Sequence, residues 1–138
     1  MTTHDAPEVN GLSAQLGYAL SVQETEEQIS EVIRHPEHSA FVYMDDEKLL
    51  GFIHVFTALR IESLPFAEIG GLVVDENSRG RGIGKQLVRK AIEWSAGKNI
   101  HTLRVRCNTR RKEAHLFYTS LGFANSKDQK VFSLDIKR

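Results

Sequence analysis

Residues 69–85 read IGGLVVDENSRGRGIGK, an apolar strand that runs into a glycine-rich turn. The turn, Arg79–Lys85, leads into a helix that we expect to begin near Ile83. Its three glycines leave main-chain N–H groups open to a ligand, and a helix N-terminus adds unpaired donors and a positive dipole. Together with the flanking cations, these groups predict an anion site suited to a pyrophosphate. We therefore expect the chain to bind a nucleotide-like cofactor.

The spacing of the turn excludes two common phosphate-binding loops. A Walker loop would need glycine where Arg79 stands and serine or threonine where Gln86 stands. A dinucleotide-binding loop would need glycine in place of Lys85. The pattern that fits is R-x-x-G-x-G, with Arg79, Gly82 and Gly84. Taken alone, this short pattern is also compatible with a glycine-rich turn whose arginines are only solvated.

Hydrophobic periodicity and turn signals divide the rest of the chain into helices and strands. Apolar residues at helical spacing predict helices over residues 5–17, 21–35, 83–97 and 114–121. Residues that are β-branched, aromatic or alternating in polarity predict strands over 40–44, 49–56, 66–75, 103–107 and 131–136. The order strand, helix, strand over residues 66–107 implies a right-handed parallel crossover. We therefore predict an α+β fold, in which a mixed β-sheet is flanked by helices.

Size and charge exclude several classes of protein. A chain of 138 residues is expected to form one domain. Its 18 basic and 18 acidic residues give a net charge of zero, which offers no attraction to nucleic acid or membranes. Cys107 is the only cysteine, so an internal disulfide is excluded, and no spacing resembles a zinc site. No apolar run reaches the roughly 18 residues that span a bilayer. We expect a cytoplasmic protein without a metal.

A second motif follows the strand at residues 103–107. Asn108 comes directly after that strand, and residues 114–123 read AHLFYTSLGF on a predicted helix. Together with R-x-x-G-x-G, this segment resembles the GNAT superfamily of N-acyltransferases, which commonly have an asparagine here, then an A-x-x-F-Y-x-x-x-G-F helix. The resemblance covers nearly the whole chain. It implies a single N-acetyltransferase (GNAT) domain over residues 1–138, with a GNAT-like mixed, mostly antiparallel, splayed β-sheet flanked by helices.

The resemblance implies transfer of an acetyl group from acetyl-CoA, as cosubstrate, to a primary amine by direct attack. The acceptor would be a small-molecule or peptide amine of unidentified structure, and related proteins often pair as homodimers. The family usually opens with a short strand, for which Met1–His4 leaves little room. The alternative is a catalytically inactive acyl-CoA-binding sensor or regulatory subunit. A nucleic-acid module that uses the arginines is disfavoured by the zero net charge.

By resemblance, the cofactor would lie along the strand and the turn that follows it. Its pantetheine arm would bond to the main chain of Leu72 and Val74 and to Asn108, and its pyrophosphate to the amides of Arg81–Lys85. The full set of cofactor-binding residues expected on this basis is Leu72, Val73, Val74, Arg79, Gly80, Arg81, Gly82, Ile83, Gly84, Lys85 and Asn108.

Tyr118 is the candidate general acid. By resemblance it would protonate the departing thiolate of the cofactor. A tyrosine has a pKa of about 10, so its hydroxyl is protonated at neutral pH and can give a proton to a thiolate whose conjugate acid has a pKa of about 8.5. The alternative is an aromatic side chain that only packs in the core.

Glu68 is the candidate general base that would deprotonate the acceptor ammonium, directly or through water. It would share a strand face with Gly70 and Val74 if no bulge intervenes. Gly70-Gly71 inside a strand indicates either a bulge or a close approach by a ligand. Several histone-type GNAT enzymes have a glutamate here within a similar Phe-Ala-Glu-Ile string. The alternative is a glutamate on a solvated face, and Glu62 is a weaker rival.

Other polar residues rank lower. His115 projects from a different side of its helix than Tyr118, which indicates a surface or substrate-fringe position. Cys107 alternates with Leu103 and Val105 and is expected to be a core thiol rather than a nucleophile. A basic cluster is interpreted as a solvated face, with contact to the adenosine phosphate as the alternative. Its members are Arg104, Arg106, Arg110, Arg111 and Lys112.

Overall fold

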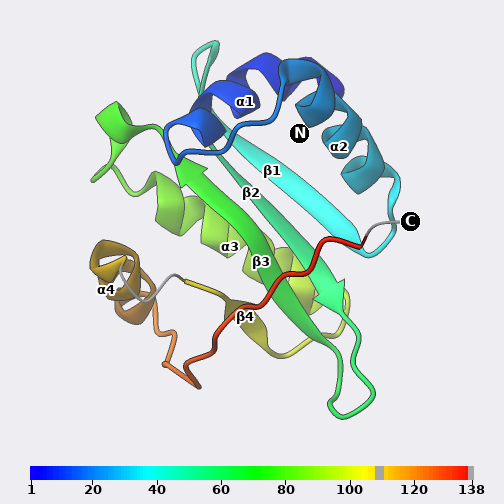
Figure 1. The fold of residues 1–138 in the computed structure, drawn as a ribbon. Coiled ribbons are helices and arrows are strands. Elements are labelled where there is room, and N and C mark those ends of the chain that lie inside the picture. Colours follow the sequence, from blue (N-terminus) through cyan, green and yellow to red (C-terminus); the bar gives the residue numbers. More distant parts are fainter. Residues whose placement is uncertain (108–110, 137–138) are drawn as a thin grey trace. The chain divides into compact units, whose positions relative to one another are not determined.

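The computed structural model describes residues 1–107 and 111–136 (Figure 1). The chain forms two compact units, Met1–Val105 and Arg106–Arg138, which are described separately below. In the described part of the chain, no helix is long and apolar enough to cross a membrane.

The first unit is built on a four-stranded sheet in the order β1-β2-β3-β4 (Figure 1). Strand β2 (Lys48–Ala58) pairs antiparallel with β1 (His38–Asp45) and with β3 (Phe66–Val74). Strand β4 (Leu103–Val105) pairs parallel with β3 and ends two residues earlier than predicted. The mixed, mostly antiparallel sheet predicted from the sequence is therefore confirmed.

Three helices flank this sheet, with α1 and α2 over one face and α3 over the other (Figure 1). Their bounds are α1 Ala6–Ala14, α2 Val22–Arg34 and α3 Ile83–Gly97. A short 3-10 helix, η1 (Thr3–Asp5), precedes α1 where the family usually has a strand. The capping box predicted for α2 is present, because the Glu24 N–H donates to Ser21 Oγ at 3.0 Å and the Ser21 N–H donates to Glu24 Oε1 at 2.9 Å.

Both faces of the sheet bury apolar side chains. On the α1 and α2 face, buried residues from the helices pack with Leu49 of β2 and Val73 of β3. On the α3 face, a side chain at Gly51 would contact Leu87 and Ile83, so strand and helix approach closely there. The α1 and α2 cluster reaches only one end of its sheet face. The opposite end of that face, where β1 and β3 begin, remains half-exposed.

The second unit contains α4 (Lys112–Ser120), which is followed by Gly122 in a left-handed conformation at φ 96°. This helix and its glycine stop were predicted from the sequence. The strand predicted over Val131–Ile136 is wrong, because these residues form no strand and the side chains of Val131, Phe132, Leu134 and Ile136 are 80–89% exposed. A strand needs a neighbouring strand for its hydrogen bonds, and the described residues of this unit form none. Alternating polarity alone cannot supply that neighbour.

Candidate active site

Gly70 is an extra residue in β3. In the pairing of β2 with β3, His54 lies opposite Gly71 and Val55 lies opposite Ile69, so Gly70 has no partner and forms a bulge. The bulge reverses which residues share a face. Glu68 therefore lies on the face of Gly71 and Val73. Glu68 was expected to share a face with Gly70 and Val74 only if no bulge intervened, and the bulge removes that condition.

The ring of His54 packs directly against this bulge. A Cβ atom at Gly70 would lie 2.9 Å from His54 Cε1 and closer still to Nδ1, so only glycine fits there. His54 Nε2 lies 2.9 Å from Nδ1 of His38, which is a hydrogen bond between two imidazoles. Burial, and then the nearby His38, lower the pKa of His54 to about 4. His54 is therefore neutral at neutral pH.

Phe56 completes a group of three rings with His38 and His54, which we call the ring platform. The planes of His38 and His54 differ by 15°, and those of His38 and Phe56 by 14°. The ring centroids of His38 and His54 lie 5.2 Å apart, which fits two rings joined at their edges by the hydrogen bond. All three side chains are half-buried. The planes of His54 and Phe56 differ by 29°, and the Phe56 centroid lies 5.1 and 5.4 Å from those of His38 and His54, so Phe56 is stacked with an offset against the two imidazoles. The ring platform is therefore a compact group of stacked rings at the half-exposed end of the sheet face.

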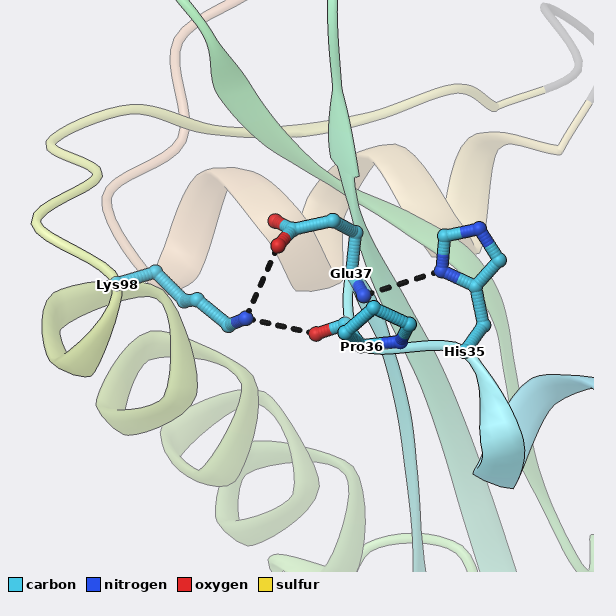
Figure 2. A network of polar contacts seen from close by, with 4 residues as sticks. All are labelled: His35, Pro36, Glu37 and Lys98. Atoms are coloured by element: carbon cyan, nitrogen blue, oxygen red, sulfur yellow. Dashed lines mark hydrogen bonds and ion pairs between the residues drawn. The ribbon is translucent and has the colours of Figure 1, made fainter.

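The start of β1 is tied to the end of α3 close to the platform (Figure 2). Lys98 Nζ donates to the Pro36 carbonyl oxygen at 2.7 Å and contacts Glu37 Oε2 at 3.2 Å. The Glu37 N–H donates to His35 Nδ1 at 3.1 Å, and the His35 ring meets the edge of His38. This network holds residues 35–37, the segment directly before His38, in place.

Glu68 lies beside the platform. It is opposite Phe56 of β2 and opposite Arg104 of β4, and its side chain is half-buried. The Arg104 guanidinium lies 3.9 Å from the centre of the Phe66 ring, and Arg60 lies 5.6 Å from it. Glu62, the weaker rival, is exposed in the loop between β2 and β3. Of the two carboxylates, only Glu68 belongs to the sheet face that carries the rings.

Strand β3 loses its β4 partner midway. The two strands pair only where Ala67–Ile69 meets Leu103–Val105. Beyond Ile69, no described strand pairs with the edge of β3 that faces β4, so no strand ladder in the described residues uses the main-chain groups of Leu72–Val74 on that edge. This geometry matches the splayed sheet that the resemblance implies.

The turn after β3 leads to an uncapped helix. Gly80 and Gly82 have φ of 83° and 78°, a left-handed conformation that favours glycine. A Cβ atom at either position would meet no atom within 4 Å, so the space beside both glycines is open. Gly82 is the N-cap of α3, and no side chain caps its N–H groups. Arg79, Arg81 and Lys85 are exposed, and Arg81 pairs with Asp45 at 2.9 Å.

The members of this turn differ in what they can offer to a ligand. The side chain of Ile83 is buried in the core, so only its main chain is available. The first turn of α3 therefore has no side-chain cap and lies in an open setting with flanking cations.

Tyr118 of the second unit is half-buried between Phe117 and Phe123, whose ring centroids lie 5.0 and 5.5 Å away. Burial, and then Cys107, raise the pKa of Tyr118 to about 12, while Arg111 opposes the shift. Its hydroxyl is therefore protonated at neutral pH. Burial also raises the pKa of Cys107, which disfavours a thiolate nucleophile.

The remaining candidate residues belong to the second unit. Asn108 lies outside the described residues, as does Arg110 of the basic cluster. His115 is half-buried on α4. Among residues 1–107 and 111–136, no group of three histidine, cysteine or acidic side chains is placed to hold a metal ion.

The ring platform was not identified from the sequence. His38, His54 and Phe56 come from two strands, and their approach depends on strand register rather than on spacing along the chain. The one sequence signal was Gly70, whose position in a strand indicated a bulge or a close contact.

Comparisons with known proteins agree with this geometry. The sequence model of the Acetyltransferase (GNAT) family matches residues 10–123. The chain is 31% identical over 109 residues to an uncharacterised N-acetyltransferase of Methanocaldococcus jannaschii, which covers 78% of this chain. It spans about half, 48%, of the length of that relative. The chain therefore belongs to the GNAT acetyltransferase family.

Solved structures have the same fold. A candidate acetyltransferase from Agrobacterium tumefaciens superposes with a TM-score of 0.85 at 25% identity, covering 97% of this chain and 96% of that one. The aminoglycoside N-acetyltransferase AAC(6')-Iy, in complex with a bisubstrate analogue of CoA and acetylneamine, superposes with a TM-score of 0.86 at 18% identity, covering 99% and 95%. At this low identity the second likeness concerns the fold alone.

A substitution at Gly70 tests the contact with His54. We expect Gly70→Ala to destabilise the fold by about 1–3 kcal/mol, because the new Cβ overlaps the His54 ring and the bulged main chain cannot move away freely. Gly71→Ala is the matched control, since a Cβ at that position meets no atom within 4 Å. Urea unfolding of both variants measures the difference. Equal stability of the two variants would contradict the close packing of His54 on the bulge.

The low pKa of His54 predicts how stability depends on pH. Its pKa is about 4 when folded and 6.5 when unfolded, so between these values the unfolded chain binds more protons. Stability from this group is complete above pH 6.5 and is lost as the pH falls toward 4. We expect His54→Leu to lose less stability than wild type between pH 7 and 4.5, measured by urea unfolding. The exposed His4→Leu should retain the wild-type loss, and an unchanged loss in His54→Leu would refute the assignment.

Proposed function

We propose that the chain transfers an acetyl group from acetyl-CoA to a primary amine by direct attack, as one N-acetyltransferase domain over residues 1–138. The observation that carries the proposal is the edge of β3 beyond Ile69, which no described strand covers and which leads into the uncapped start of α3. An extended chain that ends in a diphosphate suits this sequence of features. Its amides can bond along Leu72–Val74, and its phosphates can bond at the helix N-terminus.

The turn fits a diphosphate by its chemistry. The N–H groups at the start of α3 have no side-chain partner, and the open left-handed glycines allow close approach of a bulky anion. The proposed contacts are the main chain of residues 80–85 and the side chains of Arg79 and Lys85. Because Arg81 already pairs with Asp45, its main chain is proposed to contribute more than its guanidinium. Asn108 is proposed to bond the pantetheine arm by resemblance alone.

The bound thioester would supply an activated carbonyl carbon. The main-chain N–H groups of Leu72–Val74 are proposed to stabilise negative charge on its oxygen during attack. Glu68 is proposed to accept the proton of the acceptor ammonium, directly or through water, because it is the carboxylate on the half-exposed sheet face. The neutral amine then forms the new C–N bond as the C–S bond breaks. The nitrogen gives up its second proton as the amide forms, which balances the proton that the departing thiolate gains.

Tyr118 is proposed to interact with the thiolate that leaves when the C–S bond breaks. A pKa of about 12 keeps its hydroxyl protonated, but it also makes full proton transfer to a thiolate less favourable than for an ordinary tyrosine. We therefore propose that Tyr118 stabilises the developing thiolate by donating a hydrogen bond, with proton transfer late in the reaction. Cys107 is not proposed to act as a nucleophile, because its thiol is held protonated.

A charge at Gly82 tests the cofactor site. We expect Gly82→Glu to abolish CoA binding measured by calorimetry, because a carboxylate would repel the phosphates and a side chain is strained at φ 78°. Gly11→Glu in α1 adds the same charge in open space and should bind CoA as wild type does. Undiminished affinity in Gly82→Glu would place the diphosphate elsewhere.

Removal of one hydroxyl tests the role of Tyr118. We expect Tyr118→Phe to lower the rate of thiol release at least tenfold and to preserve CoA affinity, because general-acid assistance typically contributes 10²–10⁴-fold. Tyr18→Phe, at an exposed tyrosine, should leave the rate unchanged. CoA binding without thiol release by the wild type, over a broad amine panel, would favour an inactive sensor instead. An unchanged rate in Tyr118→Phe would mean that another group donates the proton to the thiolate.

A further inference from the structure

The ring platform lies beside Glu68, the proposed general base, but takes no part in the proposed proton transfers. His38, His54 and Phe56 lie at the end of the sheet face that the α1 and α2 cluster does not reach, and they are half-buried. Gly70 fixes the His54 ring, and the hydrogen bond to His54 fixes His38. The two imidazoles of the ring platform are therefore held in place by close packing and by a hydrogen bond.

The charges around the platform favour one kind of ligand. The three rings carry no charge at neutral pH, because the pKa of His54 is about 4 and burial also lowers the pKa of His38. Glu68 lies opposite Phe56 on the same face. Glu37, just before β1, pairs with Lys98, and the rings of His35 and His38 make a T-shaped contact. An uncharged group of aromatic rings thus borders a carboxylate.

Two arginines near Glu68 limit the charge that a ligand can carry. Arg104 and Arg60 lie against the Phe66 ring, and Arg104 is the β4 neighbour of Glu68. A second or third ammonium group on the same ligand would meet these guanidinium groups. A ligand with a single ammonium beside Glu68 and an uncharged body over the rings avoids this repulsion.

We propose that the ring platform binds the body of the acceptor, and that the preferred acceptors are primary amines with one positive charge and a flat aromatic group. The proposal rests on the proposed acetyl transfer and specifies its substrate class. The aromatic group lies against His38, His54 and Phe56, and the ammonium points to Glu68. Aromatic pairing adds to simple apolar burial, so an aromatic ring should be preferred over a saturated ring of equal size.

Two amines that differ only in aromaticity test this preference. Thiol release from acetyl-CoA is measured with 2-phenylethylamine and with 2-cyclohexylethylamine, and with spermidine and neamine as polycations. We expect kcat/KM to be roughly two- to tenfold higher for the phenyl than for the cyclohexyl compound. We expect both polycations to be poorer than either. Equal values for the two rings, or a polycation as the best acceptor, would overturn the proposal.

Matched variants locate the preference on the platform. Phe56→Leu removes one ring and keeps an apolar side chain, so the phenyl-to-cyclohexyl ratio of kcat/KM should fall toward one. Phe41→Leu makes the same change on the opposite sheet face and should keep the ratio of the wild type. Circular dichroism establishes that both variants fold. A preserved ratio in Phe56→Leu would remove the platform from acceptor binding.

A binding measurement separates this proposal from the proposed reaction. When 2-phenylethylamine is added, the ring signals of His38 and His54 in NMR spectra should shift, and those of the exposed His4 should not. If the shifts occur but no amine releases thiol, the proposal that the ring platform binds the amine is supported and the proposed acetyl transfer is contradicted. If thiol is released with no aromatic preference and no shift, the transfer stands and the platform proposal fails.

Discussion

One unpaired residue in β3 controls the geometry of the candidate site. Because Gly70 adds a residue that β2 does not match, every side chain before it changes face relative to those after it. This places Glu68 beside Phe56 and His54 rather than against α3. The same glycine provides the space that the His54 ring fills. Without the bulge, neither the carboxylate nor the rings would have this arrangement.

The two ends of β3 have different tasks in the proposed enzyme. At its beginning, Glu68 lies between β2 and β4 in a complete sheet, which holds a candidate proton acceptor at a fixed place. At its end, the strand has lost β4 and leads to the uncapped N-terminus of α3. A paired strand is rigid, whereas an unpaired edge can bond to a ligand. In the proposed reaction, the paired segment of β3 would position the general base, and the unpaired segment would bind the thioester whose carbonyl carbon the amine attacks.

Local signals in the sequence predicted most of the fold. The Ser21–Glu24 capping box, the strand before Arg79 and the helix from Ile83 depend on residues close in the chain, and the structure contains all three. The alternation at residues 131–136 predicted a strand wrongly, since a strand also depends on a distant partner. The ring platform was missed for a related reason. His38 and His54 meet only through the register of β1 with β2, which no spacing along the chain reveals.

The contact between Gly70 and His54 also constrains evolution. A side chain at position 70 would occupy the space of the His54 imidazole, so the two cannot be present together. Among descendants of this chain, the two positions should therefore be exchanged together, with a smaller residue at 54 accompanying any departure from glycine. Divergence at this pair would mark the lineages in which the proposed acceptor surface has changed.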